Sequence, residues 1–435
     1  MINKYVLRDM SAEEVTKLCM RSETDISAIR ERVRPIIAEV RNQGDQALRK
    51  FTRDFDKVDI SSHPIEVMRD EFETARSKLP EEVSSAIDSA AANIRRFHEA
   101  QMPQQMWFKQ MSEGVLAGEK ITPISSVGLY VPRGKGSFPS IMLMIGIPAV
   151  VAGVREIVVC TPPTETGVID AATLYAASVV GIERVFRVGG AQAIAAMAYG
   201  TESVPKVRKV MGPGNTYVSA AKRELIGLLD IGVPAGPSEA IILADGSVPS
   251  IIAAHDLLIE AEHGPDSSAL LVTASASYAE EVERLLPGLI EQLPRQRREY
   301  CEAVLSGYGG IVIAPDMEAA IEFVNQYAPE HMEILTSNPF VVLPAIQNAG
   351  EILMGAYTPV TLGNFSLGIN ATLPTGGFAH TYSCVTVFDF LKRSSIGFAT
   401  KSGFPEIAST AKILAEYEGF SAHANAIAIR QRGDS

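Results

Sequence analysis

Short apolar segments rich in β-branched residues alternate with helical patterns from residue 125 onward, and this alternation constrains the fold more than any other feature of the sequence. Successive segments are spaced at roughly 25 to 30 residues, the length of a βαβ unit. The segments form two series: 127–131, 156–160, 184–188 and 207–210, then 240–244, 269–273, 310–314 and 332–336. The sequence therefore predicts an α/β fold of two doubly wound parallel sheets, each an incomplete Rossmann-like unit.

Proline and glycine mark the boundary between the two series. The stretch from Gly232 to Ser238 contains two of each in seven residues and cannot continue a helix. We expect a linker or a ligand-contacting loop there. The predicted organisation is an N-terminal helical segment at 1–25, a first α/β domain of 26–124 plus 239–380, a second α/β domain of 125–238, and a C-terminal helical segment at 381–435.

Composition narrows the functional classes. A formal net charge of −12, without a basic cluster interleaved with aromatic residues, argues against nucleic acid as a partner. The four cysteines lie far apart, which is typical of thiols in a reducing compartment. The start of the chain lacks the apolar core of a signal peptide, and Ser11 and Glu14 predict a helix-capping box. We therefore expect a cytoplasmic protein.

The most apolar segment, residues 141–154, is too short to predict a membrane span. It contains Pro148 and falls short of the roughly 18 to 20 uninterrupted residues that a span needs. We expect a buried core helix and no membrane partner.

Three glycine-rich loops follow predicted strands and lead into helices, at residues 132–136, 189–192 and 212–215. In open parallel sheets, ligands bind at the carboxyl ends of the strands, and a helix N-terminus favours an anion. None of the loops is a complete G-x-G-x-x-G, and glycines are common at such turns. Three in consecutive βα loops nevertheless favour a nucleotide-binding site.

Glu260 and His263 stand three residues apart at the end of an apolar helical run. That spacing places a carboxylate and an imidazole on one helix face, as a divalent metal requires. The alternative is a simple hydrogen bond on the helix face. Further histidine ligands would have to come from His331, His380 or His423, and without a second Glu-x-x-His the sequence predicts at most one metal.

Glu330 and His331 follow a proline that should end a helix and let the two side chains diverge into a cleft. The pair is either a charged helix cap or a general acid/base pair. Serine hydrolase chemistry is disfavoured because G-x-S-x-G is absent and Ser238 has no nearby histidine in the sequence. Cys160, at the end of a strand, is either a nucleophile or a buried structural thiol.

Seven motifs resemble, in the same order, those of the histidinol dehydrogenase family, and the resemblance covers nearly the whole chain. They are Gly128-Leu-Tyr-Val-Pro132, Gly189-Gly-Ala-Gln-Ala-Ile194, Gly212-Pro-Gly-Asn215, Pro234-Ala-Gly-Pro-Ser-Glu239, Ala261-Glu-His-Gly-Pro-Asp266, Tyr327-Ala-Pro-Glu-His331 and Glu418-Gly-Phe-Ser-Ala-His423. The resemblance implies a zinc-dependent homodimer with shared active sites. It would oxidise a primary alcohol to a carboxylate by two hydride transfers to NAD, with residues 125–238 as the NAD-binding domain.

The family's functional residues carry over by position. The resemblance implies that His331 takes the alcohol proton and that Glu330 activates the water that hydrates the aldehyde. The implied NAD contacts are Tyr130, Gln192 and Asn215, and the implied zinc ligands are Glu260, His263, Asn364 and His423, with His423 reaching the neighbouring subunit's site. The implied substrate contacts are Ser238, Glu260, His263, His331, Asn364, Glu418 and His423, with Glu418 also crossing the dimer interface.

Two departures from the family pattern fall on the implied metal ligands. The family has glutamine where this chain has Glu260, and aspartate where it has Asn364. Together the two changes exchange a carboxylate and a carboxamide, so the charge and donor types at the metal are conserved. This pairing favours a retained zinc site.

Two further departures alter the substrate pocket. Ala371 replaces a substrate-facing histidine, and Gly232 stands where the family usually has aspartate; His380 is a candidate replacement for the lost imidazole. The expected reaction is therefore the oxidation of L-histidinol to L-histidine as the family default. Oxidation of another small primary alcohol or diol, or a catalytically silent homologue, remains an alternative.

Overall fold

The computed structural model describes residues 2–21, 27–133 and 136–432, which form two compact units. The larger unit comprises residues 1–101 and 125–390, and the smaller comprises 102–124 and 391–435. Each is described by itself. No helix among the described residues is long and apolar enough to cross a membrane.

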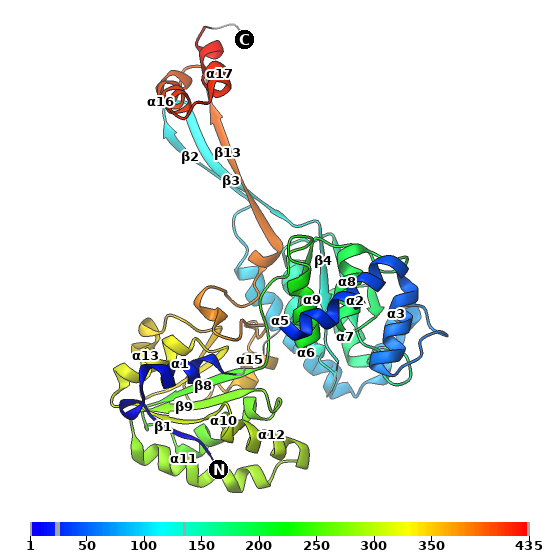
Figure 1. Ribbon diagram of the computed structural model, residues 1–435, viewed down its shortest axis with the longest axis vertical. Helices are drawn as coiled ribbons and strands as arrows, with labels where there is room; N and C mark the ends of the chain where they lie inside the picture. The colour runs from blue at the N-terminus through cyan, green and yellow to red at the C-terminus, as the bar shows by residue number, and fades with distance from the viewer. Residues whose placement is uncertain (1, 22–26, 134–135, 433–435) are drawn as a thin grey trace. The chain divides into compact units, whose positions relative to one another are not determined.

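A six-stranded parallel sheet, sheet A, organises one part of the larger unit (Figure 1). Its order is β1-β10-β9-β8-β11-β12. The strands are β1 Lys4–Val6, β8 Glu239–Ala244, β9 Ser268–Thr273, β10 Gly310–Ile313, β11 His331–Leu335 and β12 Glu351–Met354. The strands that the sequence predicted from residue 240 onward are confirmed.

Helices cover both faces of sheet A, because alternate residues of its strands face two separate apolar cores. One core holds α10 Ser250–Ala261, α11 Ala276–Glu291 and α12 Arg295–Ser306. The other holds α1 Ala12–Met20 and α13 Met317–Tyr327. Two short helices, α14 Pro339–Val342 and α15 Val360–Phe365, follow β11 and β12.

Sheet B, the second parallel sheet of the larger unit, has the order β6-β5-β4-β7. Its strands are β4 Ser126–Tyr130, β5 Glu156–Thr161, β6 Val185–Arg187 and β7 Lys209–Met211. Its helices are α2 Ser27–Gln43, α3 Asp45–Phe51, α4 Arg69–Ala75, α5 Glu81–Ala100, α6 Pro139–Val151, α7 Ala171–Val180, α8 Gly190–Tyr199 and α9 Thr216–Glu224. The core helix predicted at 141–154 is confirmed, because α6 is buried from Met142 to Ala149.

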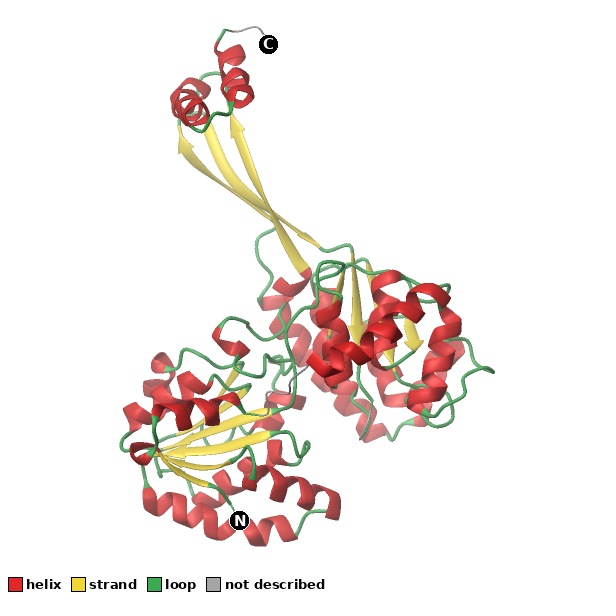
Figure 2. Cartoon of the chain, viewed as in Figure 1, coloured by secondary structure: helices red, strands yellow, loops and turns green. Residues whose placement is uncertain are grey.

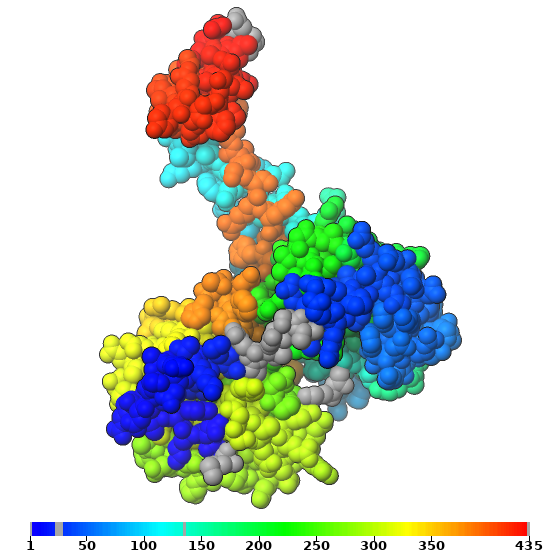
Figure 3. Space-filling model, viewed as in Figure 1, coloured from blue at the N-terminus to red at the C-terminus, as the bar shows by residue number. Residues whose placement is uncertain are grey.

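Residues 27–100 pack on sheet B, whereas the sequence grouped 26–124 with 239–380. Val33, Ile36 and Val40 of α2 share one apolar core with α8 and α9. Because α8 is rich in alanine, its side chains are small and α2 can pack close to its backbone. In Figure 3 the blue surface of these N-terminal residues abuts the green surface of α9.

The first residues of the chain also differ from the expected helical segment. The N-terminal strand β1 pairs with β10 in parallel, so the chain begins as an edge of sheet A. The capping box is confirmed, since the Ser11 hydroxyl accepts from the Glu14 N–H and the Glu14 carboxylate accepts from the Ser11 N–H. Residues 22–26 lie outside the described part of the chain.

The smaller unit is a three-stranded antiparallel sheet, of order β13-β3-β2, that is followed by two helices (Figure 2). Its elements are β2 Met106–Ser112, β3 Val115–Pro123, β13 Leu391–Ala399, α16 Phe404–Tyr417 and α17 Ser421–Gln431. The sequence predicted the C-terminal helices but not this sheet, because its strands come from two distant parts of the chain.

Candidate active site

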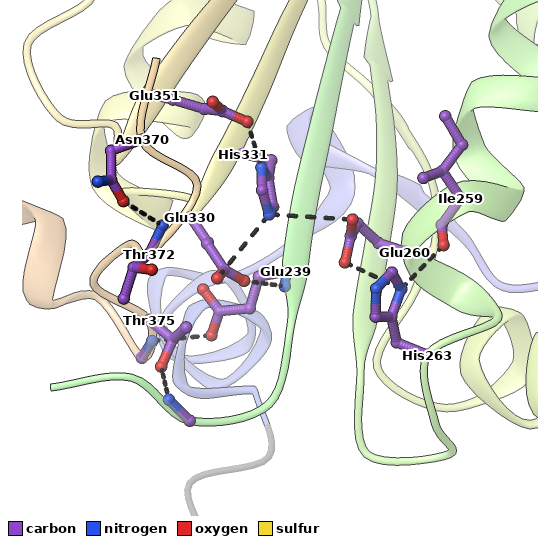
Figure 4. A network of polar contacts seen from close by, with 12 residues as sticks. Glu239, Ile259, Glu260, His263, Glu330, His331, Glu351, Asn370, Thr372 and Thr375 are labelled. Carbon is purple, nitrogen blue, oxygen red and sulfur yellow. Dashed lines mark hydrogen bonds and ion pairs between the residues drawn. The ribbon is translucent and has the colours of Figure 1, made fainter. Parts of the chain in front are cut away.

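Polar residues gather at the amino ends of the strands of sheet A. Glu239, His331 and Glu351 are the first residues of β8, β11 and β12, and the register pairs His331 with Ala240 on one side and Glu351 on the other. Glu330 directly precedes β11. Figure 4 shows these side chains converging at one edge. For sheet A, the expectation that function lies at the carboxyl ends of the strands is therefore not met.

His331 lies at the centre of this group, with only 4% of its side chain exposed. Its Nδ1 lies 2.5 Å from Oε1 of Glu351. Its Nε2 lies 3.8 Å from Oε1 of Glu330 and 3.9 Å from Oε1 of Glu260. Burial alone lowers the pKa of His331, but the three carboxylates outweigh burial and raise the pKa to about 10.

Glu330 is held by the backbone of the neighbouring strand. Its Oε2 accepts a hydrogen bond of 2.9 Å from the Glu239 N–H. Burial raises the pKa of Glu330 well above its ordinary value; His331 opposes this shift, while the Glu260 and Glu239 carboxylates add to it. A buried carboxyl group with a raised pKa is a candidate for acid/base chemistry.

Glu239 and Arg21 form a buried ion pair that the sequence did not reveal. The Arg21 guanidinium lies 3.2 Å from Oε2 of Glu239 and 3.7 Å from the centre of the Tyr327 ring. Oε1 of Glu239 accepts from the Gly376 N–H at 2.8 Å. Burial raises the pKa of Glu239 to about 7 in spite of Arg21. In the sequence, the ion pair was indicated only by the position of Glu239 directly after Ser238, a predicted substrate contact.

Glu260 and His263 meet as their spacing predicted, since Oε2 of Glu260 lies 3.3 Å from Nδ1 of His263. His263 Nδ1 also donates to the Ile259 carbonyl at 3.0 Å, which places the lone pair of a neutral ring on Nε2. Glu260 is 1% exposed, and within the described ranges neither of its carboxylate oxygens accepts a hydrogen bond. A buried carboxylate of this kind beside an imidazole fits a divalent cation.

The remaining implied metal ligands come from other elements. Asn364 is half-buried in α15, and the neighbouring Gly363 packs so closely that a Cβ there would lie 3.0 Å from Oε2 of Glu351. His423 is exposed in α17 of the smaller unit. In the part of the chain that the structure describes, no three His, Cys, Asp or Glu residues form a cluster that could hold a metal. A metal at Glu260 and His263 would therefore need further ligands beyond these two residues.

A cavity of about 820 Å³ lies in the larger unit beside this edge of sheet A. Its wall includes the Gly214-Asn215 turn, Lys222, the loop 233–237 and Glu239. It thus joins the glycine-rich loop after β7 to the acidic group at the start of β8. The chain that contains Ser238 connects these two walls, and Ser238 itself is half-buried there.

The implied nucleotide contacts lie at the carboxyl ends of sheet B, where the sequence placed them. Tyr130 ends β4, and its hydroxyl accepts from the Gly190 N–H at 3.0 Å. Gln192 is fully buried, and neither polar atom of its carboxamide has a hydrogen-bond partner among the described residues. Asn215 is exposed and caps α9, with its Oδ1 accepting from two backbone N–H groups. An unpaired buried carboxamide beside two glycine turns fits a nucleotide ligand.

Gly232, Ala371 and His380 are the positions that bear on the altered substrate pocket. Gly232 has φ +63°, and a Cβ there would lie 2.6 Å from Sδ of Met211, so a larger residue would be strained. His380 is exposed, and its Nε2 lies 3.2 Å from the Gln326 carbonyl, outside the wall of the cavity. Nothing in the structure explains Ala371.

Cys160 and Glu418 complete the predicted residues. Cys160 is fully buried in β5, and burial raises its pKa, so the structure favours a structural thiol over a nucleophile. Glu418 is exposed at the end of α16 in the smaller unit.

Comparisons with known proteins agree with this geometry. A family model described as histidinol dehydrogenase matches residues 19–431. "Histidinol dehydrogenase homolog 2" of Mesorhizobium japonicum is 51% identical over 433 residues, covering 99% of this chain and 98% of the relative. "Histidinol dehydrogenase" of Synechocystis sp. is 47% identical over 426 residues, covering 98% of each. The crystal structure of histidinol dehydrogenase from Elizabethkingia anophelis has a TM-score of 0.94 at 34% identity, covering 99% of this chain and 98% of that one. The chain therefore belongs to the histidinol dehydrogenase family, which comprises oxidoreductases of histidine biosynthesis.

Proposed function

We propose that the protein is an NAD- and zinc-dependent dehydrogenase that oxidises a primary alcohol to a carboxylate through an aldehyde, with L-histidinol as the first substrate to test. One observation carries the proposal. The buried pair of Glu330 and His331 lies beside the carboxylate of Glu260, which accepts no hydrogen bond among the described residues, and Glu239, whose N–H holds Glu330, lines a cavity of about 820 Å³.

His331 would accept the alcohol proton at Nε2, the ring nitrogen that faces Glu330 and Glu260. For this step the ring must be neutral, yet the surrounding carboxylates raise its pKa to about 10. Ligation of a divalent metal by Glu260 would neutralise one of these carboxylates and lower the pKa of His331. Glu330, held by the Glu239 N–H, would then take a proton from the water that hydrates the aldehyde.

Two molecules of NAD, bound one after the other, would each supply the acceptor for one hydride, and bound zinc would hold and polarise the alcohol oxygen. We assign NAD contacts to Tyr130, Gln192 and Asn215. The zinc ligands would be Glu260, His263, Asn364 and His423 of the partner subunit, a set of two imidazoles, one carboxylate and one carboxamide. Ser238 and Glu418 would contact the substrate, together with His331 and the zinc ligands.

The composition of the smaller unit supports a homodimer. Its buried residues are few and small, whereas large apolar side chains are exposed on its strands and helices: Trp107, Phe108, Met111, Phe398, Ile413, Tyr417 and Ile429. A unit of this size has too little core to be stable alone, and a second copy of the chain is the partner that the proposal requires. Sedimentation of the full chain should give a dimer, and Tyr417→Asp should shift it toward monomer.

A cytoplasmic location is part of the proposal. All four cysteines are free thiols, and Cys160 and Cys301 are buried, which fits a reducing compartment.

A second candidate is the oxidation of a different small primary alcohol or diol. Ala371 favours it, because loss of an imidazole that contacts the substrate removes a hydrogen bond worth about 1 to 3 kcal/mol. Relatives at 51% identity from Mesorhizobium japonicum and Rhizobium meliloti are named only as histidinol dehydrogenase homologs. A panel of L-histidinol, other amino alcohols and diols, followed by NADH formation, separates the two candidates.

The same assay tests whether the protein is an enzyme at all. Stoichiometric zinc together with two NADH per alcohol consumed would support the proposal. Purified protein that holds no zinc and yields no NADH with any alcohol would instead mark a silent homologue.

The exchanged ligands allow a sharper test of the metal site. Asn364→Asp alone should disturb the metal site and change its zinc affinity by adding a second carboxylate, and Glu260→Gln combined with Asn364→Asp should restore it. Equal zinc affinity in all three proteins, measured by competition with a chelating dye, would contradict the ligand assignment.

A further inference from the structure

Glu351 is a buried carboxylate for which the proposed reaction has no role. It begins β12 directly opposite His331 in the register of sheet A. Only 4% of each side chain is exposed, and Oε1 of Glu351 lies 2.5 Å from Nδ1 of His331. Figure 4 shows the two side chains pointing toward each other from neighbouring strands. Glu351 therefore contacts the ring nitrogen that the proposed reaction does not use.

This contact determines which nitrogen of a neutral His331 ring carries the proton. A carboxylate oxygen accepts hydrogen bonds, so we assign Nδ1 of the ring as the donor to Glu351. The lone pair of the ring then lies on Nε2, which faces Glu330 and Glu260 at 3.8 and 3.9 Å. Only this tautomer can accept a proton from a substrate on that side.

Rigid elements fix the position of the Glu351 carboxylate. Its backbone N–H donates to the Glu330 carbonyl at 3.0 Å, so the strand that carries Glu351 is bonded to the residue before His331. On the other side Gly363 of α15 packs against the carboxylate, and a Cβ at that position would lie 3.0 Å from Oε2. The carboxylate thus has little freedom to turn away from the ring.

We propose that Glu351 is a positioning residue that holds His331 in the Nδ1–H tautomer and directs Nε2 toward the reacting alcohol. In the step it assists, the proton leaves the alcohol oxygen for Nε2, while the Nδ1 proton stays on the ring and remains bonded to Glu351. The step rests on the proposed dehydrogenase function. The tautomer does not, because the hydrogen bond exists without substrate.

The test is Glu351→Gln in the full-length protein. A carboxamide keeps the size of the side chain but can donate a hydrogen bond to Nδ1, which favours the opposite tautomer. Nitrogen NMR of histidine-labelled protein, with and without added Zn²⁺ and at a pH where the ring is neutral, reports the protonated nitrogen; His331→Asn identifies the signal. We expect Nδ1–H in the wild type and Nε2–H in the variant. We also expect kcat to fall about 10²- to 10⁴-fold, the range for a misplaced tautomer, with little change in KM.

Two further variants separate positioning from general disruption. Glu333→Gln removes another buried carboxyl on the same face of β11, but Glu333 bonds the Val360 N–H rather than the ring. It should leave the His331 tautomer unchanged. Glu351→Asp keeps an acceptor and should retain Nδ1–H with a smaller loss of kcat, and it decides the question if the Gln variant does not fold.

Two outcomes would overturn the role of Glu351: Nε2–H in the wild type, or an unchanged tautomer and kcat in Glu351→Gln. If the tautomer changes as expected but no alcohol is oxidised by the wild type, the dehydrogenase proposal fails and the positioning role of Glu351 stands.

Discussion

The two parallel sheets of the larger unit present their polar residues at opposite ends of their strands. In sheet B, Tyr130 ends β4 and the turns at Gly190 and Gly212 follow β6 and β7, so backbone N–H groups and glycines line the carboxyl edge. In sheet A, Glu239 and Glu351 begin strands, so carboxylates line the amino edge. Sheet B therefore presents backbone N–H groups at its edge, whereas sheet A presents carboxylate side chains.

Backbone N–H groups hold two of the carboxylates at the amino edge of sheet A. Oε2 of Glu330 accepts from the Glu239 N–H, and Oε1 of Glu239 accepts from the Gly376 N–H. The edge therefore holds buried carboxyl groups in fixed positions, as acid/base chemistry requires. Under the proposed function, sheet B would bind the nucleotide and sheet A would carry the reacting groups.

The largest expected effect is on the reacting sheet. Glu330→Gln removes the proposed base for water, so oxidation of the aldehyde should fall about 10²- to 10⁴-fold, the range for loss of general base catalysis. The alcohol step should fall less, because His331 remains. Stopped-flow NADH formation from each substrate measures the two steps, and Glu318→Gln, an exposed residue of α13, is the control. Equal losses in both steps would contradict the assignment of the aldehyde step to Glu330 and of the alcohol step to His331.

Glu239→Gln tests the cost of holding carboxyl groups at this edge. Between pH 4.5 and about 7, the folded protein binds more protons at Glu239 than the unfolded chain does. Stability must fall as pH rises through that window, by about 3 kcal/mol for a shift of this size. The wild type should lose this free energy of unfolding relative to Glu239→Gln between pH 4.5 and 7.5, as measured in urea. If the free energy of unfolding changed with pH in the same way in both proteins, the raised pKa of Glu239 would be contradicted.

Gly212→Ala tests the binding sheet. Gly212 has φ +115°, and a Cβ would collide with the Tyr130 carbonyl oxygen. Such strain costs about 1 to 3 kcal/mol of folding free energy, and NAD affinity should fall with it. Gly288→Ala is the control, because Gly288 lies in α11 beside sheet A and no described atom lies within 4 Å of the point that its new methyl group would occupy. Equal stability and equal NAD affinity in the two variants would contradict the proposal that backbone groups of sheet B bind NAD.

Gln192→Met should have the smallest effect, and it should change stability and NAD affinity in opposite directions. Replacing an unpaired buried carboxamide with an apolar side chain of similar size should stabilise the protein without ligand by about 1 kcal/mol. The same change should weaken NAD binding, as measured by calorimetry. A variant that is both less stable and unchanged in NAD affinity would assign Gln192 a purely structural role.

Local patterns in the sequence predicted more of sheet B than of sheet A. Glycines after strands predict turns in sheet B. In the same way, the spacing of Glu260 and His263 predicts that the two side chains lie within one turn of a helix. Glu239 and Glu351 carry no such signal, because a glutamate at the start of a strand resembles a solvated turn residue. Their roles depend on strand register between distant segments. Arg21 was likewise hidden, since its partners Glu239 and Tyr327 are brought to it only by the fold.

The central strand of the smaller unit has a consequence for how the chain folds during synthesis. β3 pairs with β2 beside it, but its other edge pairs with β13, with Lys120 opposite Ser394. Nearly the whole of the larger unit must be synthesised before that partner exists. Until then β3 presents an open edge beside the exposed Trp107 and Phe108, a state prone to aggregation. Chains that end before residue 391 should therefore depend on chaperones far more than the complete protein does.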